Sequence, residues 1–238
     1  MHNFYGKKIL LLTSYTIPYT AGGGINAFNF GKFLTERGIN CQILTFSRNL
    51  RLSLKTASGG LYIYRIPILD KYNAIATFFC IGRNVERYPE IYDQILKRGH
   101  FTGNHTYSHL KGWQTGSKEY YNDIKLASCF IKSNLFRPPY GKIKRTQLKH
   151  LRHYYNIIMW DVMSFDFSRS VSKEKCLSLL LNNVRPGSII VFHDSPKASE
   201  NMFYALPETL EYFIKQDYSF KSIPNTLIHH SRIVKEHA

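Results

Sequence analysis

Acidic side chains are scarce in this sequence. Its 238 residues hold 16 aspartates and glutamates against 32 lysines and arginines, which gives a formal net charge of +16. Such an excess favours anionic partners, among them phosphate-rich polymers, nucleic acid and acidic membrane surfaces. The basic residues are scattered, however, and the densest run, from Lys142 to His153, is typical of a solvated helix face. No base-stacking module accompanies that run, so we expect no nucleic-acid partner.

Paired cysteines and long apolar runs are also missing. The four cysteines lie far apart and form no Cys-x-x-Cys motif: Cys41, Cys80, Cys129 and Cys176. Neither a zinc ribbon nor a redox pair is therefore predicted, and we expect reduced cysteines in the core. The apolar run from Ile9 to Leu12 stops at Thr13, too early for a secretory signal or a membrane span. A cytoplasmic protein is the corresponding expectation.

The first third of the chain has the pattern of a β-α-β unit. The predicted elements are a strand at Ile9–Thr13, a helix at Ile25–Arg37, and strands at Cys41–Phe46 and Leu61–Ile66. Gly22 to Gly24 would let the backbone approach a phosphate, but a long loop precedes them and no acid follows the second strand. We favour a flexible turn there. The stretch from Lys7 to Pro67 resembles the opening of family-4-type GT-B glycosyltransferases without their second Rossmann domain, so we expect no transferase activity.

The remainder of the chain alternates strands with helices. Strands are predicted at Ile75–Gly82, Ile157–Trp160 and Ser188–Phe192. Helices are predicted at Val85–Arg98, Ser117–Asn134, Arg145–Tyr155, Ser172–Val184 and Tyr204–Gln216. This alternation indicates an α/β fold with a parallel sheet, closed or open.

Four polar motifs lie at the ends of these elements. His105 and His109 are four residues apart, so one helical turn would aim both imidazoles at one cation, with surface histidines as the alternative. The segment Arg137 to Gly141 carries a guanidinium and a phenol on a stiff backbone, or is an ordinary Pro-stiffened loop. Asp166 lies just past a predicted strand, where helix caps are common. His193 directly follows a buried strand, at the edge where barrel enzymes keep their chemistry.

In order and spacing, these motifs resemble the NodB-type polysaccharide deacetylases of carbohydrate esterase family 4. The matching segments are His105 to His109, Arg137 to Gly141, Asp166, and Ile189 to Asp194. Phe167 stands where the family usually has tryptophan beside the acid. The resemblance runs from about Ile68 to Ile223, and four ordered motifs make it specific. We therefore expect a glycosyltransferase-like segment at 1–67, a deacetylase domain at 68–224 and a tail at 225–238.

The resemblance implies a distorted (β/α) barrel that uses a divalent metal, commonly zinc, to remove acetyl groups from N-acetylated sugars. His105 and His109 would bind the metal, which lowers the pKa of its bound water. The candidate catalytic residues are His193, Asp166, Arg137 and Tyr140. The backbone at Tyr140 would help hold the oxyanion, and His193, tuned by Asp166, would protonate the leaving amine.

The family's first motif, Thr-Phe-Asp-Asp-Gly-Pro, is absent. It supplies the general base and the third metal ligand, yet this sequence has no Asp-Asp pair. Asp70 is the nearest upstream acid, but it belongs to the end of a further predicted helix, at 68–73, rather than to a strand end. If the Ile9–Thr13 strand took the place of the missing first barrel strand, it would bring only Thr13 and Ser14 to the position of the two aspartates. The expected fold is thus an incomplete barrel preceded by a Rossmann-like β-α-β segment. We expect a weakened metal site and impaired deacetylation, since a lost general base costs about 10²–10⁴-fold in rate.

Two alternatives stay open at this stage. A catalytically silent module would bind glycans through aromatic residues such as Tyr107, Trp113 and Tyr140. A glycosyltransferase-like protein would bind a nucleotide sugar at Gly22 to Gly24. The histidines near the end of the sequence, His229, His230 and His237, belong to a stretch that we expect to be a frayed tail.

Overall fold

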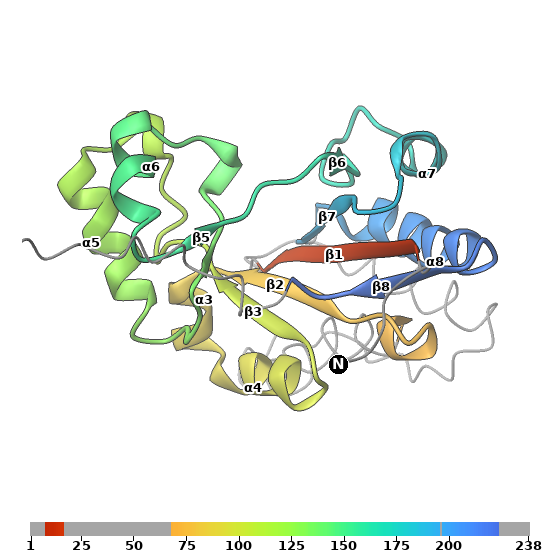
Figure 1. The fold of residues 1–238 in the computed structure, drawn as a ribbon, viewed down its shortest axis with the longest axis horizontal. Coiled ribbons are helices and arrows are strands. Elements are labelled where there is room, and N and C mark those ends of the chain that lie inside the picture. The colour runs from red at the N-terminus through yellow and green to blue at the C-terminus, as the bar shows by residue number, and fades with distance from the viewer. Residues whose placement is uncertain (1–7, 17–67, 196, 224–238) are drawn as a thin grey trace, which may run out of the picture.

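One parallel sheet organises the part of the chain that the computed structural model describes, residues 8–16, 68–195 and 197–223 (Figure 1). Its strands are β1 (Lys8–Thr16), β2 (Ala76–Cys80), β3 (Phe101–Asn104), β4 (Leu135–Phe136), β5 (Asn156–Ile157), β6 (Val162–Met163), β7 (Ile189–Asp194) and β8 (Tyr218–Lys221). The order across the sheet is β5-β4-β3-β2-β1-β7-β6, and β8 pairs with the first half of β1. The predicted α/β class with a parallel sheet is confirmed.

Helices connect the strands, as parallel pairing requires. They are α3 (Gly82–Arg87), α4 (Pro89–Lys97), α5 (Ser117–Ala127), α6 (Arg145–Leu151), α7 (Lys173–Asn183) and α8 (Ser199–Ile214), with short 3₁₀ turns at Gly112–Gln114 and Pro139–Gly141. The start of α7 shows most clearly how a local residue sets a helix boundary. The Ser172 hydroxyl accepts a hydrogen bond from the Lys175 backbone N–H and so caps the helix.

Strand β1 lies in the centre of the sheet. It pairs with β2 and β7 along its second half, so Tyr15 is level with Phe79 and His193, and Thr16 is level with Asp194 (Figure 1). The strand was predicted to end at Thr13, and it continues for three further residues. Tyr15 and Thr16, the last two residues of β1, therefore lie beside the His193 motif. We had predicted Thr13 and Ser14 at this place.

The core occupies both faces of the sheet. All five side chains of β2 are buried, as is typical of a central parallel strand. Phe78 and Cys80 belong to the cluster that packs against the helices, while Phe79 belongs to a second cluster with Val191. Burying one such phenylalanine stabilises the fold by about 1.5–3 kcal/mol. Along β2, alternate side chains therefore face opposite sides of the sheet.

Several predicted boundaries were wrong. The helix expected over Val85–Arg98 is two helices, because Tyr88 leaves the helical conformation and Pro89 begins α4. The helix expected over Ser117–Asn134 ends at Ala127, and only the first residue of the strand expected at Ile157–Trp160 belongs to β5. Strands β3, β4, β6 and β8 were not predicted. The helix at 25–37 and the strands at 41–46 and 61–66 lie outside the described residues.

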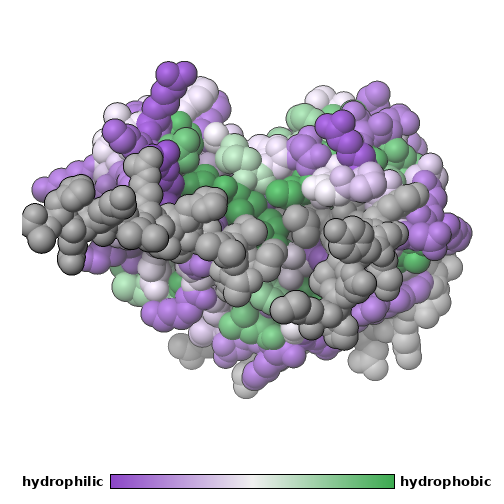
Figure 2. All heavy atoms as spheres, viewed as in Figure 1, coloured by the Kyte–Doolittle hydropathy of each residue, from purple (hydrophilic) through white to green (hydrophobic). Residues whose placement is uncertain are grey.

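The surface is hollowed between two lobes. Figure 2 shows the depression between the lobe that carries α5 and α6 and the lobe that carries β6 and α7, with hydrophobic residues exposed on its floor. Within the described residues, no helix combines the length and the apolar character needed to cross a membrane.

Candidate active site

The loop after β3 carries both predicted metal-binding histidines, and it is not helical. Thr106 and His109 have φ angles of 63° and 61°, so the expected helical turn at this motif was wrong. The Asp123 carboxylate of α5 holds the loop by accepting hydrogen bonds from the backbone N–H groups of Tyr107 and Ser108, both at 2.9 Å. The loop is therefore held in its conformation by a carboxylate 15 residues further along the chain, and not by helical hydrogen bonds.

His105 and His109 nevertheless lie together. Their ring centroids are 4.9 Å apart, and the His105 side chain is completely buried. Its Nδ1 lies 2.6 Å from the backbone carbonyl of Arg137, and because a carbonyl only accepts, the proton belongs on Nδ1 and the ring's lone pair on Nε2. Burial lowers the pKa of His105 well below its ordinary value and lowers the pKa of His109 to about 4. Both rings are therefore neutral near pH 7, the state in which imidazole binds metals.

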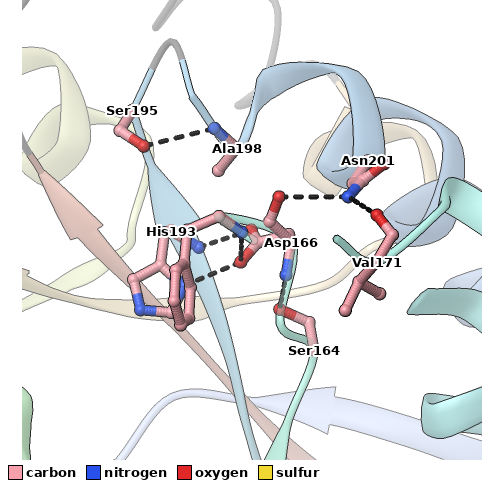
Figure 3. A network of polar contacts seen from close by, with 8 residues as sticks. Ser164, Asp166, Val171, His193, Ser195, Ala198 and Asn201 are labelled. Atoms are coloured by element: carbon pink, nitrogen blue, oxygen red, sulfur yellow. Dashed lines mark hydrogen bonds and ion pairs between the residues drawn. The ribbon is translucent and has the colours of Figure 1, made fainter. Parts of the chain in front are cut away.

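His193 is fixed by Asp166. The Asp166 carboxylate accepts hydrogen bonds from the ring Nδ1 and from the backbone N–H of His193, both at 2.7 Å (Figure 3). Asp166 is completely buried, and its own backbone is held by Asn201 of α8, whose side-chain amide donates to the carbonyls of Asp166 and Val171. The ring of Phe167 lies edge-on against the His193 ring, with centroids 4.5 Å apart.

The three imidazoles form one site. The last residues of β3, β2, β1 and β7 are level with one another, so His193 near the end of β7 and the histidine pair just after β3 lie at the same edge of the sheet. The structure therefore brings His105, His109, His193 and Asp166 together, as the motif order predicted. Asp70 does not join them, since it is exposed and pairs with Arg98 at 2.7 Å.

Arg137 and Tyr140 take different positions in the third motif. The Arg137 guanidinium is completely buried, lies 4.1 Å from the centre of the Phe79 ring, and donates to the carbonyls of Ile158 and Met159. Tyr140 is half exposed, with φ 60°, and its ring contacts that of His109 at 4.7 Å. The motif thus has one buried anchor and one residue at the surface of the site.

The residues present do not complete a three-ligand metal site. His105 and His109 supply two nitrogen donors, but among the described residues no group of three or more His, Cys, Asp or Glu side chains is placed to hold a metal ion. Strand β1, which ends beside His193, reads Leu12-Thr13-Ser14-Tyr15-Thr16 and contains no carboxylate, imidazole or thiolate. Zinc sites of catalytic type use three protein ligands.

Sequence reasoning missed three residues that shape the site: Lys111, Asp123 and Asn201. Asp123 and Asn201 lie inside helices, where an acid or an amide is unremarkable in the sequence. Lys111 is two residues beyond His109, and its charge contributes to the low pKa of that histidine. Only the fold shows that these side chains serve the site.

A parallel sheet with imidazoles and a buried carboxylate at the carboxyl ends of its strands defines an α/β protein with a site equipped for general acid–base chemistry. Comparison with known proteins gives the particular family. The family model described as Polysaccharide deacetylase matches residues 56–155, which begins before the predicted start near Ile68. The peptidoglycan-N-acetylglucosamine deacetylase of Bacillus cereus is 38% identical over 208 residues, covering 81% of this chain and 74% of the relative. A second B. cereus protein of the same name is 31% identical over 170 residues, covering 68% and 79%. This chain belongs to the polysaccharide deacetylase family.

Solved structures agree on the fold. A crystal structure of a peptidoglycan N-acetylglucosamine deacetylase superposes with a TM-score of 0.67 at 24% identity, covering 92% of this chain and 88% of that one. A family pseudoenzyme from Bacillus anthracis superposes with a TM-score of 0.63 at 20% identity, covering 92% and 64%. The fold of this chain is therefore that of the family's deacetylases, the distorted barrel type, over most of its length.

Proposed function

We propose that this protein binds N-acetylated glycans at the site of His105, His109 and His193, and that its hydrolysis of their acetamide C–N bond is impaired. The observation that carries the proposal is the register of β1. Tyr15 and Thr16 stand level with His193 and Asp194, at the edge where the sequence resemblance expects two aspartates. Neither residue can serve as a carboxylate base or as a carboxylate ligand to a metal.

The remaining residues support two steps of the proposed reaction: protonation of the leaving amine and stabilisation of the oxyanion. With Asp166 accepting from Nδ1, the His193 ring is held in the orientation that presents Nε2 as the atom that carries and delivers a proton. Delivery of that proton to the leaving amine would complete collapse of a tetrahedral intermediate. The backbone N–H of Tyr140, in its left-handed conformation, is our candidate for the donor to the oxyanion.

Activation of the attacking water is the step for which we assign no residue among those that the structure describes. A positioned general base contributes about 10²–10⁴-fold to rate, so its loss alone predicts slow turnover. Residues 1–67 contain one acid, Glu36, and no aspartate, so the amino-terminal segment has little with which to replace the missing pair. His105 and His109 would still hold a divalent cation, most readily zinc, but more weakly than three ligands would.

Relatives indicate the substrate class. Two of them are named as peptidoglycan-N-acetylglucosamine deacetylases, which supports a polymer of N-acetylated sugars as the ligand. The B. anthracis pseudoenzyme supports the view that this fold is retained where activity is not, and a mutant of it is described as having restored enzymatic activity. Impairment in the present chain is our inference from its own residues.

Acetate release tests the proposal directly. We would measure zinc content and acetate release from N-acetylglucosamine oligomers, with the B. cereus relative assayed in parallel. We expect less than one zinc per chain after dialysis, and acetate release at least about 10²-fold slower than that of the relative. Stoichiometric zinc together with turnover as fast as that of the relative would refute the impairment.

A catalytically silent carbohydrate-binding module is the second candidate. It is favoured by two exposed aromatic side chains near the site, Trp113 and Tyr140, which are 58% and 51% exposed. Glycan binding with no acetate release above background would favour this silent module over an impaired deacetylase. The nucleotide-sugar site at Gly22 to Gly24 lies outside the described residues and stays a prediction, as do the glycosyltransferase-like segment and the cytoplasmic location.

A further inference from the structure

Two aromatic rings that contact the site histidines, and a third ring on the 3₁₀ turn that follows the histidine loop, each lie beside a lysine. The distances from Nζ to the ring centroid are 4.9 Å for Lys111 and Tyr140, 5.2 Å for Lys142 and Trp113, and 6.0 Å for Lys197 and Phe167. We call these six residues the aromatic–lysine rim. All three distances lie within the range of a cation–π contact, which is a weak interaction where water reaches the ammonium group. An anionic ligand could therefore draw each ammonium group away from its ring.

The rim is continuous with the proposed active site. The Tyr140 ring that Lys111 covers also contacts the ring of His109, with centroids 4.7 Å apart. On the other side, the Phe167 ring beside Lys197 contacts the ring of His193 at 4.5 Å. A ligand held at the histidines would extend over these aromatic residues.

Trp113 is exposed but firmly held. Its indole N–H donates to the backbone carbonyl of Ile143 at 3.0 Å, although 58% of the residue is accessible to solvent. The buried Gln147 side chain donates to the carbonyls of Gly112 and Thr115, on either side of the tryptophan. A rigid exposed indole loses little entropy when a ligand packs on it, which is typical of a binding residue.

Positive charge is concentrated in this part of the chain. Residues 111–153 contain ten lysines and arginines and two acids, a net charge of +8, which is half of the total of +16 in 43 of 238 residues. One of the two acids, Asp123, is occupied by the backbone N–H groups of the histidine loop. Arg137, one of the ten, is completely buried, so the positive charge that a glycan on the rim would meet is that of the three rim lysines.

We propose that the rim selects an anionic glycan, an N-acetylated sugar chain that carries carboxylate or phosphate groups. The aromatic rings would stack on the apolar faces of the sugars, and Lys111, Lys142 and Lys197 would pair with the anionic substituents. This inference rests on the proposed function, because it assigns the substrate class of the same site. It accounts for lysines of this chain that the proposed deacetylation does not use.

Binding measurements on the full chain test this preference without using turnover. The probes are a neutral N-acetylglucosamine oligomer, a hyaluronan oligosaccharide of equal length as the carboxylate form, and an O-phosphorylated N-acetylglucosamine oligomer as the phosphate form. We expect at least one anionic probe to bind about tenfold more tightly than the neutral one at low salt. The difference should vanish near about 1 M salt, where the screening length falls to about 3 Å.

Substitutions identify the residues responsible. The double variant Lys111→Gln/Lys142→Gln should lose most of the anionic preference, about twofold to fivefold per lysine, and keep its affinity for the neutral oligomer. The control Lys97→Gln/Lys215→Gln removes the same charge from exposed positions in α4 and after α8, and should keep the preference. Trp113→Ala should weaken the binding of neutral and anionic probes alike by about tenfold.

Equal affinity for neutral and anionic probes would overturn the preference and leave the proposed function intact. An equal loss in the rim variant and the control would do the same, because general charge would then explain the effect. If no glycan probe binds, both the preference and the proposed function are wrong. Tighter binding of a double-stranded oligonucleotide than of any glycan, lost through the same two lysines, would also overturn the preference.

Discussion

The carboxylate of Asp166 receives both the ring Nδ1 and the backbone N–H of His193, each at 2.7 Å, in a position that solvent does not reach. One side chain thus fixes the ring and the end of strand β7 together. Since burial strengthens a charge-assisted hydrogen bond and makes its loss costly, this pair should contribute to stability as well as to the site.

Asp166→Asn should lower the free energy of unfolding by about 1.5–3 kcal/mol, because the amide loses the charge that both hydrogen bonds depend on. Denaturant unfolding of purified protein measures the change. Asp70→Asn is the matched control, since Asp70 also forms a 2.7 Å ion pair, with Arg98, but at the exposed surface. That substitution should cost less than about 1 kcal/mol. Equal losses in the two variants would mean that burial of Asp166 is unimportant.

Stability should fall as the pH is lowered from about 6.5 to about 4. The folded-state pKa of His109 is lowered to about 4, mainly by burial, so in this interval the unfolded chain takes up a proton that the folded chain does not. Below the folded pKa both states are protonated and the loss is complete, at up to about 3 kcal/mol for this residue. His105 acts in the same direction.

His109→Asn removes this group and should flatten the dependence of unfolding free energy on pH between about 4 and 6.5. The measurement is a series of denaturant titrations across that interval for the variant and the original protein. Parallel curves would show that His109 titrates alike in the folded and unfolded states. They would contradict the lowered pKa that we attribute to its burial.

Gly141→Ala should disturb the loop that carries Tyr140. Gly141 has φ 68°, and an added Cβ would lie 2.8 Å from the tip of the Trp160 ring, so both backbone strain and a steric clash arise. We expect a loss of about 2–4 kcal/mol in unfolding free energy. Gly99→Ala is the control, with φ 77° but nothing within 4 Å of the added atom, and should cost about 1–2 kcal/mol. Equal losses would show that contact with Trp160 does not matter.

Helices were the most predictable part of the fold. The periodic segment expected at Ser172–Val184 is α7, with Ser172 as its cap, because an amphipathic repeat and a capping serine are local signals. Strands β4, β5 and β6 have two residues each, too few to show any period, and their positions depend on neighbouring strands. Pro89 is a local signal for the break between α3 and α4. The apolar repeat continues across it, however, and a single helix was therefore predicted.

The chemical identity of the site was predictable, but its geometry was not. Motif order indicated His105, His109, Asp166 and His193, because each motif follows a strand and the strands share one edge. The left-handed conformation at His109 had no local signal, since only a small minority of residues other than glycine adopt it. The loop owes its shape to Asp123 on another element. The register of β1 depends on pairing with β2 and β7, which lie 60 or more residues away.

That register gives the most direct test of the proposed loss of function. Tyr15→Asp/Thr16→Asp places two carboxylates level with His193 and Asp194, whereas the control Thr13→Asp/Ser14→Asp places them two residues earlier. For both variants, zinc content and acetate release from N-acetylglucosamine oligomers would be measured after circular dichroism has confirmed folding. We predict one zinc per chain and at least about a 10²-fold faster release for the first variant alone. A folded first variant with no gain, or an equal gain in the control, would contradict the assignment of the missing acids to Tyr15 and Thr16.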